Sequence, residues 1–250
     1  MKMKIKGLIA GVVLAASFAS SFAFADTLRV GCEPTFAPFE FKDSKTGEYK
    51  GFDMDLIREM ARRAGHKVEI VSMGFDALIP ALSSKSLDVV ASGVTITEER
   101  AQKVDFTAPY YVAGQGLLVR KADKAKYVDL NSLKGKTIAV QIGTTGAEMA
   151  AKVPGARVKA FNATSEAFME LRLKGADAVL LDKPVIGYFM VVKPAAARGL
   201  SLQPAIFEAE SFGFAVRKGE RKLLSELDAA LKAMRSDGTY GKIYRKWFAN

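Results

Sequence analysis

Arg100 is the strongest candidate for ligand chemistry in this sequence. Thr97 has a side chain typical of a helix N-cap, which places Arg100 in the first turn of a short helix. A cation there opposes the helix dipole, so a role in stability is disfavoured. A planar guanidinium beside free backbone N–H groups suits a carboxylate ligand. A surface arginine paired with Glu98 or Glu99 fits the spacing equally well.

Asp182 is the second candidate, because it follows an apolar run, residues 178–181, that is typical of a buried strand. A lone carboxylate at such a position is costly without a partner, and an ammonium group would provide one. As an alternative, Asp182 serves as the N-cap of a helix expected over residues 183–192.

A short turn, Gly143-Thr144-Thr145-Gly146, precedes an expected helix and offers backbone N–H groups to an anion. It is too short for a phosphate-binding loop and lacks the lysine of one, which argues against nucleotide binding. Phe36 and Phe75 have the size to clamp an apolar ligand stem, although most phenylalanines of this kind belong to the core.

The supply of metal-binding and catalytic side chains is small. The chain of 250 residues has one cysteine, Cys32, and one histidine, His66. This excludes an intramolecular disulfide framework and disfavours metal sites, so we expect neither metal nor cofactor. We expect Cys32 to be buried and His66, which follows a helix-ending glycine, to be solvated.

Composition indicates a globular protein, with 49% hydrophobic and 26% charged residues. The formal net charge is +10, of which Lys2, Lys4 and Lys6 contribute three charges. The other basic residues are scattered over helix faces and are not interleaved with aromatic residues, so we expect no nucleic-acid binding.

The first 25 residues have the pattern of a secretory signal peptide. The three lysines precede an apolar run over residues 8–19, and Ala23-Phe24-Ala25 matches an A-x-A cleavage site. The apolar run is short for a membrane span, which disfavours an uncleaved anchor. We expect cleavage after Ala25 and export to the periplasm.

Short apolar runs alternate with amphipathic helical patterns along the rest of the chain. The expected strands cover residues 28–31, 68–71, 87–91, 137–140, 157–160 and 178–181. A helix with Asp53 as N-cap follows the first of them, and further helices are expected over 76–84, 147–152 and 164–174. Two consecutive β-α-β-α-β units predict two parallel sheets with helices on both faces.

Two extended segments, residues 109–114 and 207–213, connect the halves, and two helices, 223–234 and 240–248, end the chain. In open α/β sheets, ligands bind beyond the carboxyl ends of the strands. That rule selects the loops after four strands, which contain Glu33, Ser92, Gly93, Thr95, Gln141 and Asp182.

Six segments of the sequence together resemble the periplasmic amino-acid-binding proteins of ABC importers, solute-binding protein family 3, which includes glutamine-, histidine- and lysine/arginine/ornithine-binding proteins. The segments are Phe36-Ala-Pro-Phe-Glu-Phe, Gly51-Phe-Asp-Met-Asp-Leu, Phe75-Asp-Ala-Leu-Ile-Pro-Ala-Leu, Gly93-Val-Thr-Ile-Thr-Glu-Glu-Arg, Val104-Asp-Phe-Thr and Asp237-Gly-Thr-Tyr. Each is weak alone, but their order and spacing are specific, and the likeness covers essentially all of the mature chain.

The resemblance implies an α/β, two-lobed periplasmic-binding-protein fold (type II), with two doubly wound sheets joined by two hinge crossovers. Lobe 1 would comprise residues 26–110 plus 209–250, and lobe 2 residues 111–208. The ligand would lie between them, and hinge closure is a known behaviour of such proteins.

The resemblance also implies roles for single residues. Arg100 matches the residue that holds the ligand's α-carboxylate and Asp182 the one that holds its α-ammonium group. Ser92, Gly93 and Thr95 match contacts to the same groups, and Thr145 matches a lobe 2 contact to the carboxylate. Phe36 and Phe75 match the walls around the ligand stem. Glu33 and Gln141 fall where family members vary with side-chain preference.

Because the charges of Arg100 and Asp182 cancel, Glu33 would leave the pocket with a net charge near −1. This charge favours a cationic side chain (arginine, lysine or histidine) or the amide of glutamine, and it disfavours an acidic ligand. If Glu33 is a solvated loop acid instead, this bias disappears. The implied partners are a free L-amino acid and an ABC permease in the inner membrane, with the protein a monomer and not an enzyme. Two alternatives remain: an enzyme like cyclohexadienyl dehydratase, with Glu33 or Glu148 as general acid, and a ligand-sensing input protein.

Overall fold

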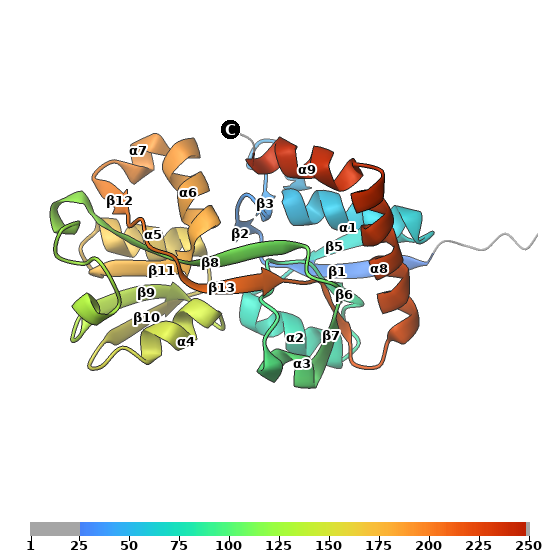
Figure 1. The fold of residues 1–250 in the computed structure, drawn as a ribbon, viewed down its shortest axis with the longest axis horizontal. Helices are drawn as coiled ribbons and strands as arrows, with labels where there is room; N and C mark the ends of the chain where they lie inside the picture. The colour runs from blue at the N-terminus through green and yellow to red at the C-terminus, as the bar shows by residue number, and fades with distance from the viewer. Residues whose placement is uncertain (1–25, 249–250) are drawn as a thin grey trace, which may run out of the picture.

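The computed structural model describes residues 26–248 and shows two sheet-based lobes joined by two long strands (Figure 1). Lobe 1 has a five-stranded sheet in the order β5-β1-β6-β14-β7. Its strands are β1 (Thr27–Cys32), β5 (Lys67–Ser72), β6 (Val89–Val90), β7 (Val104–Phe106) and β14 (Ala215–Arg217). Its helices are α1 (Phe52–Arg63), α2 (Phe75–Ser83), α3 (Glu98–Lys103), α8 (Arg221–Ser236) and α9 (Thr239–Phe248).

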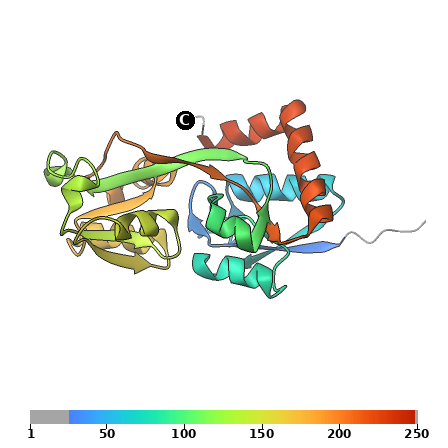
Figure 2. The ribbon, with the colours of Figure 1, turned by 60° about the horizontal axis from the view of Figure 1, so that its bottom comes forward.

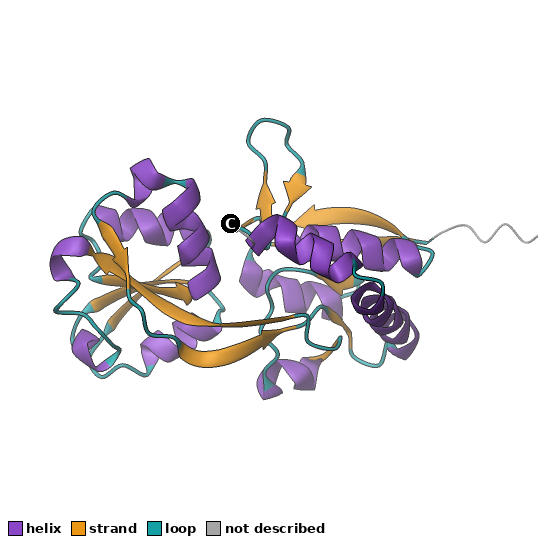
Figure 3. Cartoon of the chain, turned by 45° about the horizontal axis from the view of Figure 1, so that its top comes forward, coloured by secondary structure: helices purple, strands orange, loops and turns teal. Residues whose placement is uncertain are grey.

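A small antiparallel sheet belongs to the same lobe and projects beyond its helices (Figure 3). Its strands are β2 (Thr35–Phe36), β3 (Glu40–Lys42) and β4 (Tyr49–Lys50). Strand β2 lies on the side of lobe 1 that faces lobe 2 (Figure 1).

Lobe 2 has a sheet in the order β10-β9-β11-β8-β12, with β13 also paired to β8. The strands are β8 (Tyr111–Arg120), β9 (Thr137–Gln141), β10 (Arg157–Phe161), β11 (Ala178–Asp182), β12 (Leu200–Leu202) and β13 (Phe207–Phe212). The helices are α4 (Thr145–Ala151), α5 (Thr164–Arg172), α6 (Lys183–Val192) and α7 (Pro194–Ala197), and short 3-10 turns cover Lys121–Asp123 and Asn131–Leu133. The fold class predicted from the sequence is therefore confirmed.

Continuous apolar runs account for the centre of each sheet. Every residue of β9 and of β11 is buried, as expected for central strands that are covered by helices on both faces. This is why the sequence pattern located these strands to within one residue.

The hinge consists of β8 and β13, which run side by side from one lobe to the other (Figures 1 and 2). They pair antiparallel, with Glu210 opposite Ala113 and Phe212 opposite Tyr111. The lobe 1 end of this ribbon packs into an aromatic cluster, since the ring centre of Phe39 lies 4.9 Å from that of Tyr111 and 5.2 Å from that of Phe212. Edge-on aromatic contacts of this kind stabilise the packing of the hinge against lobe 1.

Three predictions are wrong. The two sheets are mixed and not parallel throughout, because β14 runs antiparallel to β6 and β7, and β8 runs antiparallel to β11, β12 and β13. Asp53 is not the N-cap of α1, because Gly51 takes that position and the Asp53 side chain is fully buried inside the lobe. His66 is not solvated, since it is half-buried and its Nε2 lies 3.1 Å from Glu226 Oε2. Cys32 is buried, as predicted.

Candidate functional site

The candidate site lies between the lobes, where loops from the two sheets meet. Glu33 follows β1 in lobe 1, and Gln141 ends β9 in lobe 2. The Gln141 Nε2 donates a hydrogen bond of 2.8 Å to Glu33 Oε2. In open α/β sheets, ligands bind beyond the carboxyl ends of the strands. The loops predicted on that basis are in contact with each other in the fold.

Arg100 is buried between the lobes, with 8% of its surface exposed. Its Nη1 donates to the Thr95 carbonyl oxygen at 2.9 Å, and its Nη2 donates to the Gly143 carbonyl oxygen of lobe 2 at 3.0 Å. Thr97 caps α3 through its Oγ1, which accepts from the Arg100 N–H at 3.2 Å. The capping prediction is confirmed.

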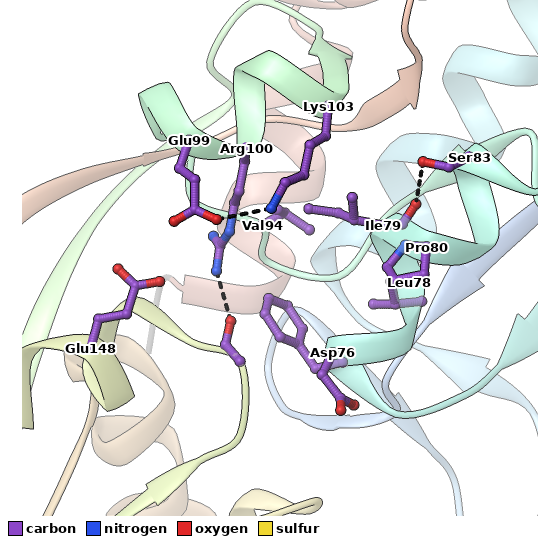
Figure 4. Close-up of a pocket in the computed structure, with 12 residues that line it drawn as sticks. Asp76, Leu78, Ile79, Pro80, Ser83, Val94, Glu99, Arg100, Lys103 and Glu148 are labelled. Carbon is purple, nitrogen blue, oxygen red and sulfur yellow. Dashed lines mark hydrogen bonds and ion pairs between the residues drawn. The ribbon is translucent and has the colours of Figure 1, made fainter. Parts of the chain in front are cut away.

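The surface-arginine alternative for Arg100 is wrong. The nearby Glu99 pairs with Lys103 at 2.9 Å, on the same short helix. The Arg100 guanidinium carbon lies 5.5 Å from the ring centre of Phe75, and Figure 4 shows the side chain pointing towards Glu148 of lobe 2. Burial lowers the pKa of Arg100, while the negative charges of Glu148, Glu210 and Asp182 oppose that shift.

Asp182 occupies the N-cap position of α6, but its side chain makes no capping hydrogen bond. It is 4% exposed, and within residues 26–248 its Oδ1 has no hydrogen-bond partner. Burial, followed by the charge of Glu210, raises the pKa of Asp182 to about 8. A buried carboxylate in this condition is stabilised by a cation that approaches it.

Glu33 is 5% exposed, so the solvated-loop alternative is wrong. Its Oε2 accepts from Thr35 Oγ1 at 2.8 Å in addition to Gln141 Nε2. Burial raises the pKa of Glu33, and the hydrogen bonds from Thr35 and Gln141 act in the opposite direction. Glu33 is thus a fixed acidic group of the wall between the lobes.

The loop of Ser92 and Gly93 is held from inside lobe 1. Ser92 Oγ donates to Glu40 Oε1 at 2.9 Å, and the Gly93 N–H donates to Asp53 Oδ2 at 2.8 Å. Gly93 has φ +54°, and a Cβ there would lie 2.8 Å from the Phe36 ring, so glycine is required. Because the Gly93 N–H and the Ser92 proton are used inward, any contact of Gly93 to a ligand would involve its carbonyl oxygen.

The two predicted aromatic walls differ in position. Phe36 is 5% exposed and its ring centre lies 5.9 Å from that of Phe39, so it is largely a core residue. Phe75 is half-buried and borders a cavity of about 470 Å³ together with Arg100, Gly143 and Glu148 (Figure 4).

Glu210 is the main site residue that the sequence did not reveal. Its Oε2 accepts from Thr95 Oγ1 at 2.8 Å, Thr145 Oγ1 at 3.0 Å and Gln115 Nε2 at 3.2 Å. It is 7% exposed, and with Thr95 and Thr145 it borders a second cavity of about 550 Å³. The sequence did contain one indication of its role, because Glu210 is a charged residue in the extended segment 207–213 that was expected to connect the two halves.

Other chemistry has little support in the described residues. Over residues 26–248 there is no group of three or more side chains arranged to hold a metal ion. In the same range, no helix has both the length and the apolar character needed to cross a bilayer.

Two α/β lobes on a two-stranded hinge, with charged residues of both lobes buried between them, define a two-lobed solute-binding protein. The sequence of residues 28–250 matches the model of the bacterial extracellular solute-binding proteins, family 3. The chain belongs to this family.

Curated relatives and solved structures agree with this assignment. A probable histidine-binding protein of Neisseria gonorrhoeae is 38% identical, over 88% of this chain and 82% of the relative. The lysine/arginine/ornithine-binding periplasmic protein of Escherichia coli is 33% identical, over 99% of this chain and 97% of the relative. An ancestral arginine-binding protein bound to arginine superposes with TM-score 0.85 at 46% identity, over 89% and 98%. The ancestral amino acid-binding protein AncCDT-1, a precursor of cyclohexadienyl dehydratase, gives TM-score 0.82 at 44% identity, over 89% and 95%.

Proposed function

We propose that this protein binds a cationic L-amino acid, L-arginine before the others, in the cleft between its lobes. The observation that carries the proposal is the pair Arg100 and Asp182, which are buried on opposite lobes, with the Arg100 guanidinium reaching the Gly143 carbonyl oxygen of lobe 2. Arg100 would hold the α-carboxylate and Asp182 the α-ammonium group, so that a single zwitterion neutralises both.

The acidic character of the cleft supports a cationic side chain. Glu33 and Glu210 are buried acids in addition to the Arg100–Asp182 pair, and the backbone of an amino acid, which this pair would bind, adds no net charge. A cationic side chain near Glu33 would reduce this excess, whereas an acidic one would increase it. The arginine-bound ancestral structure and the histidine- and lysine/arginine/ornithine-binding relatives support a cationic ligand. A second structure of an ancestral arginine-binding protein holds glutamine, which is why glutamine is kept among the ligands to be tested.

Binding would favour the closed arrangement of the lobes, because the ligand contacts both walls only there. Moving a population from 1:99 to 99:1 requires about 5.5 kcal/mol of differential binding. Hydrogen bonds to charged groups contribute roughly 1.5–3 kcal/mol each, so a few of them suffice.

The proposal includes the protein's place in the cell. We infer export through the N-terminal signal, which lies outside the described residues, with cleavage after Ala25. The mature monomer would deliver its amino acid to an ABC permease of the inner membrane. Residues 26–110 plus 209–250 would move as one lobe and residues 111–208 as the other.

A dehydratase activity is the second candidate, and the likeness to AncCDT-1 is the observation that favours it. Such a reaction needs a positioned general acid. Glu33 already accepts two hydrogen bonds, and Glu148 is exposed beside the first cavity. We therefore propose binding without catalysis. Incubation with prephenate or arogenate and ultraviolet detection of an aromatic product would contradict this if product formed.

Calorimetry tests the proposed binding. The mature chain, freed of copurified ligand by unfolding and refolding, is titrated with each of the twenty L-amino acids and with D-arginine. We expect saturable heat with L-arginine, weaker binding of the other basic amino acids and of glutamine, and none with L-glutamate or D-arginine. Absence of binding by every basic and amide amino acid would overturn the proposal.

A further inference from the structure

Glu210 joins the two walls of the cleft through the strand that connects the lobes. Thr95 belongs to lobe 1 and Thr145 to lobe 2, and both hydroxyl groups donate to the same Glu210 oxygen. Gln115, on the other hinge strand, donates to that oxygen as well. Hydrogen bonds from both lobes and from the hinge therefore converge on one carboxylate.

The direction of these hydrogen bonds follows from the chemical groups. An ionised carboxylate only accepts, while a threonine hydroxyl has a single proton and two lone pairs. Thr95 and Thr145 each donate their proton to Glu210 and retain lone pairs for other partners. The Gln115 Nε2 also lies 3.3 Å from Thr145 Oγ1, so that oxygen already accepts once.

We propose that Glu210 is a positioning residue of the ligand site, which orients the Thr95 and Thr145 hydroxyl groups as hydrogen-bond acceptors for a cationic amino acid. This inference rests on the proposed function and adds a residue that acts through two others. Glu210 need not touch the ligand for this role.

The same use of hydroxyl protons recurs around the cleft. Thr35 Oγ1 donates to Glu33, and Ser92 Oγ donates to Glu40. Within residues 26–248, the Oδ1 of Asp182 also has no partner. The cleft thus presents acceptors, with Arg100 as its fixed cation, and it complements a ligand with many N–H donors and one carboxylate. Basic L-amino acids have this chemistry.

A double-mutant cycle tests the proposal by calorimetry with L-arginine. The variants are Glu210→Gln, the pair Thr95→Val with Thr145→Val, and all three together. We expect Glu210→Gln alone to raise the dissociation constant at least tenfold. In the valine background, where the hydroxyl groups are gone, the same change should alter the constant by less than about twofold, because coupled residues are not additive.

Two controls separate positioning from a general loss of structure. Glu208→Gln changes an exposed acid of the same strand and should leave the affinity within twofold of wild type. Thr95→Ser keeps the hydroxyl and should bind more tightly than Thr95→Val. If Glu210→Gln fails to fold, this serine and valine comparison, repeated at Thr145, decides whether the hydroxyl groups matter.

The outcomes are distinguishable. Glu210→Gln within twofold of wild type, or equal effects of Glu210→Gln in both backgrounds, would overturn the role of Glu210 while leaving the proposed function intact. Equal affinities of the serine and valine variants would do the same. A wild-type protein that binds no amino acid would refute the proposed function and this inference with it.

Discussion

Arg100 combines three properties: burial, contacts to carbonyl oxygens of both lobes, and an aromatic ring beside its guanidinium group. Its two carbonyl contacts are neutral acceptors, so neither of them provides a counter-charge to the guanidinium group. A carboxylate ligand would supply that compensation with bidentate geometry.

The first prediction concerns this charge. Arg100→Ala should raise the dissociation constant for L-arginine about 100-fold or more, because removing one partner of a buried ion pair costs about 3–5 kcal/mol. Arg100→Lys should recover part of the loss, since the charge remains without the planar fork. Lys103→Ala, at the exposed end of the same helix, is the matched control. Affinity of the alanine variant within tenfold of wild type would contradict the role of Arg100.

The second prediction concerns selectivity and Glu33. Glu33→Gln keeps the side-chain shape and an acceptor for Thr35, but it removes the charge. The ratio of the affinities for L-arginine and L-glutamine should fall about tenfold. A hydrogen bond to a charged group is stronger than one to a neutral group by about 1 kcal/mol, which corresponds to nearly a tenfold change in affinity. Competition calorimetry with both ligands measures the ratio. An unchanged ratio would show that another group reads the side chain.

At the scale of elements, the sequence predicts what is encoded locally. Apolar runs located the strands, and the Thr97 cap located the helix of Arg100. The resemblance assigned Arg100 and Asp182, both of which the fold buries. Glu210 and Asp53 were missed as site residues because their partners are distant in the chain. Asp53 contacts Gly93, 40 positions away, and Glu210 contacts Thr95, 115 positions away. No local periodicity encodes such pairs.

Asp53 connects α1 to both the ligand loop and the hinge. Its Oδ2 accepts from the Gly93 N–H at 2.8 Å and from Tyr110 O–H at 2.6 Å. Burial raises the pKa of Asp53 to about 7, and these two hydrogen bonds partly oppose that rise. Between pH 4 and 7 the folded state therefore holds more protons than the unfolded state, so this group lowers the free energy of unfolding as the pH rises.

The third prediction follows from this loss of stability with rising pH. Asp53→Asn keeps an acceptor oxygen for Gly93 and Tyr110 but has no charge to bury. Relative to wild type, the variant should gain stability between pH 5 and pH 8, by up to about 3 kcal/mol. Urea denaturation of both proteins without ligand, at both pH values, measures the difference. A stability difference that does not change between pH 5 and pH 8 would contradict the buried, titrating Asp53.

At the scale of the whole molecule, three direct hydrogen-bonded contacts join the lobes in addition to the hinge strands and Glu210. Arg100 reaches Gly143, Gln141 reaches Glu33, and Thr164 of α5 reaches Thr35 of β2. The first two involve proposed ligand contacts, so they would change when the ligand enters. The Thr164 contact differs from them because neither of its residues is a proposed ligand contact, and it therefore reports on closure itself.

The fourth prediction isolates that contact. Thr164 Oγ1 donates to the Thr35 carbonyl oxygen at 2.6 Å, and Thr164→Val removes this bond while preserving the shape of the side chain. Losing one hydrogen bond of about 0.5–1.5 kcal/mol should weaken L-arginine binding roughly 3- to 10-fold, mainly through faster dissociation. Ser165→Ala, at an exposed neighbouring position, should have no such effect. Stopped-flow fluorescence gives the rates, and small-angle scattering without ligand should show a larger radius of gyration for Thr164→Val. If the rates match those of wild type, the Thr35–Thr164 contact does not stabilise the closed lobes, and the ligand-bridged contacts alone account for closure.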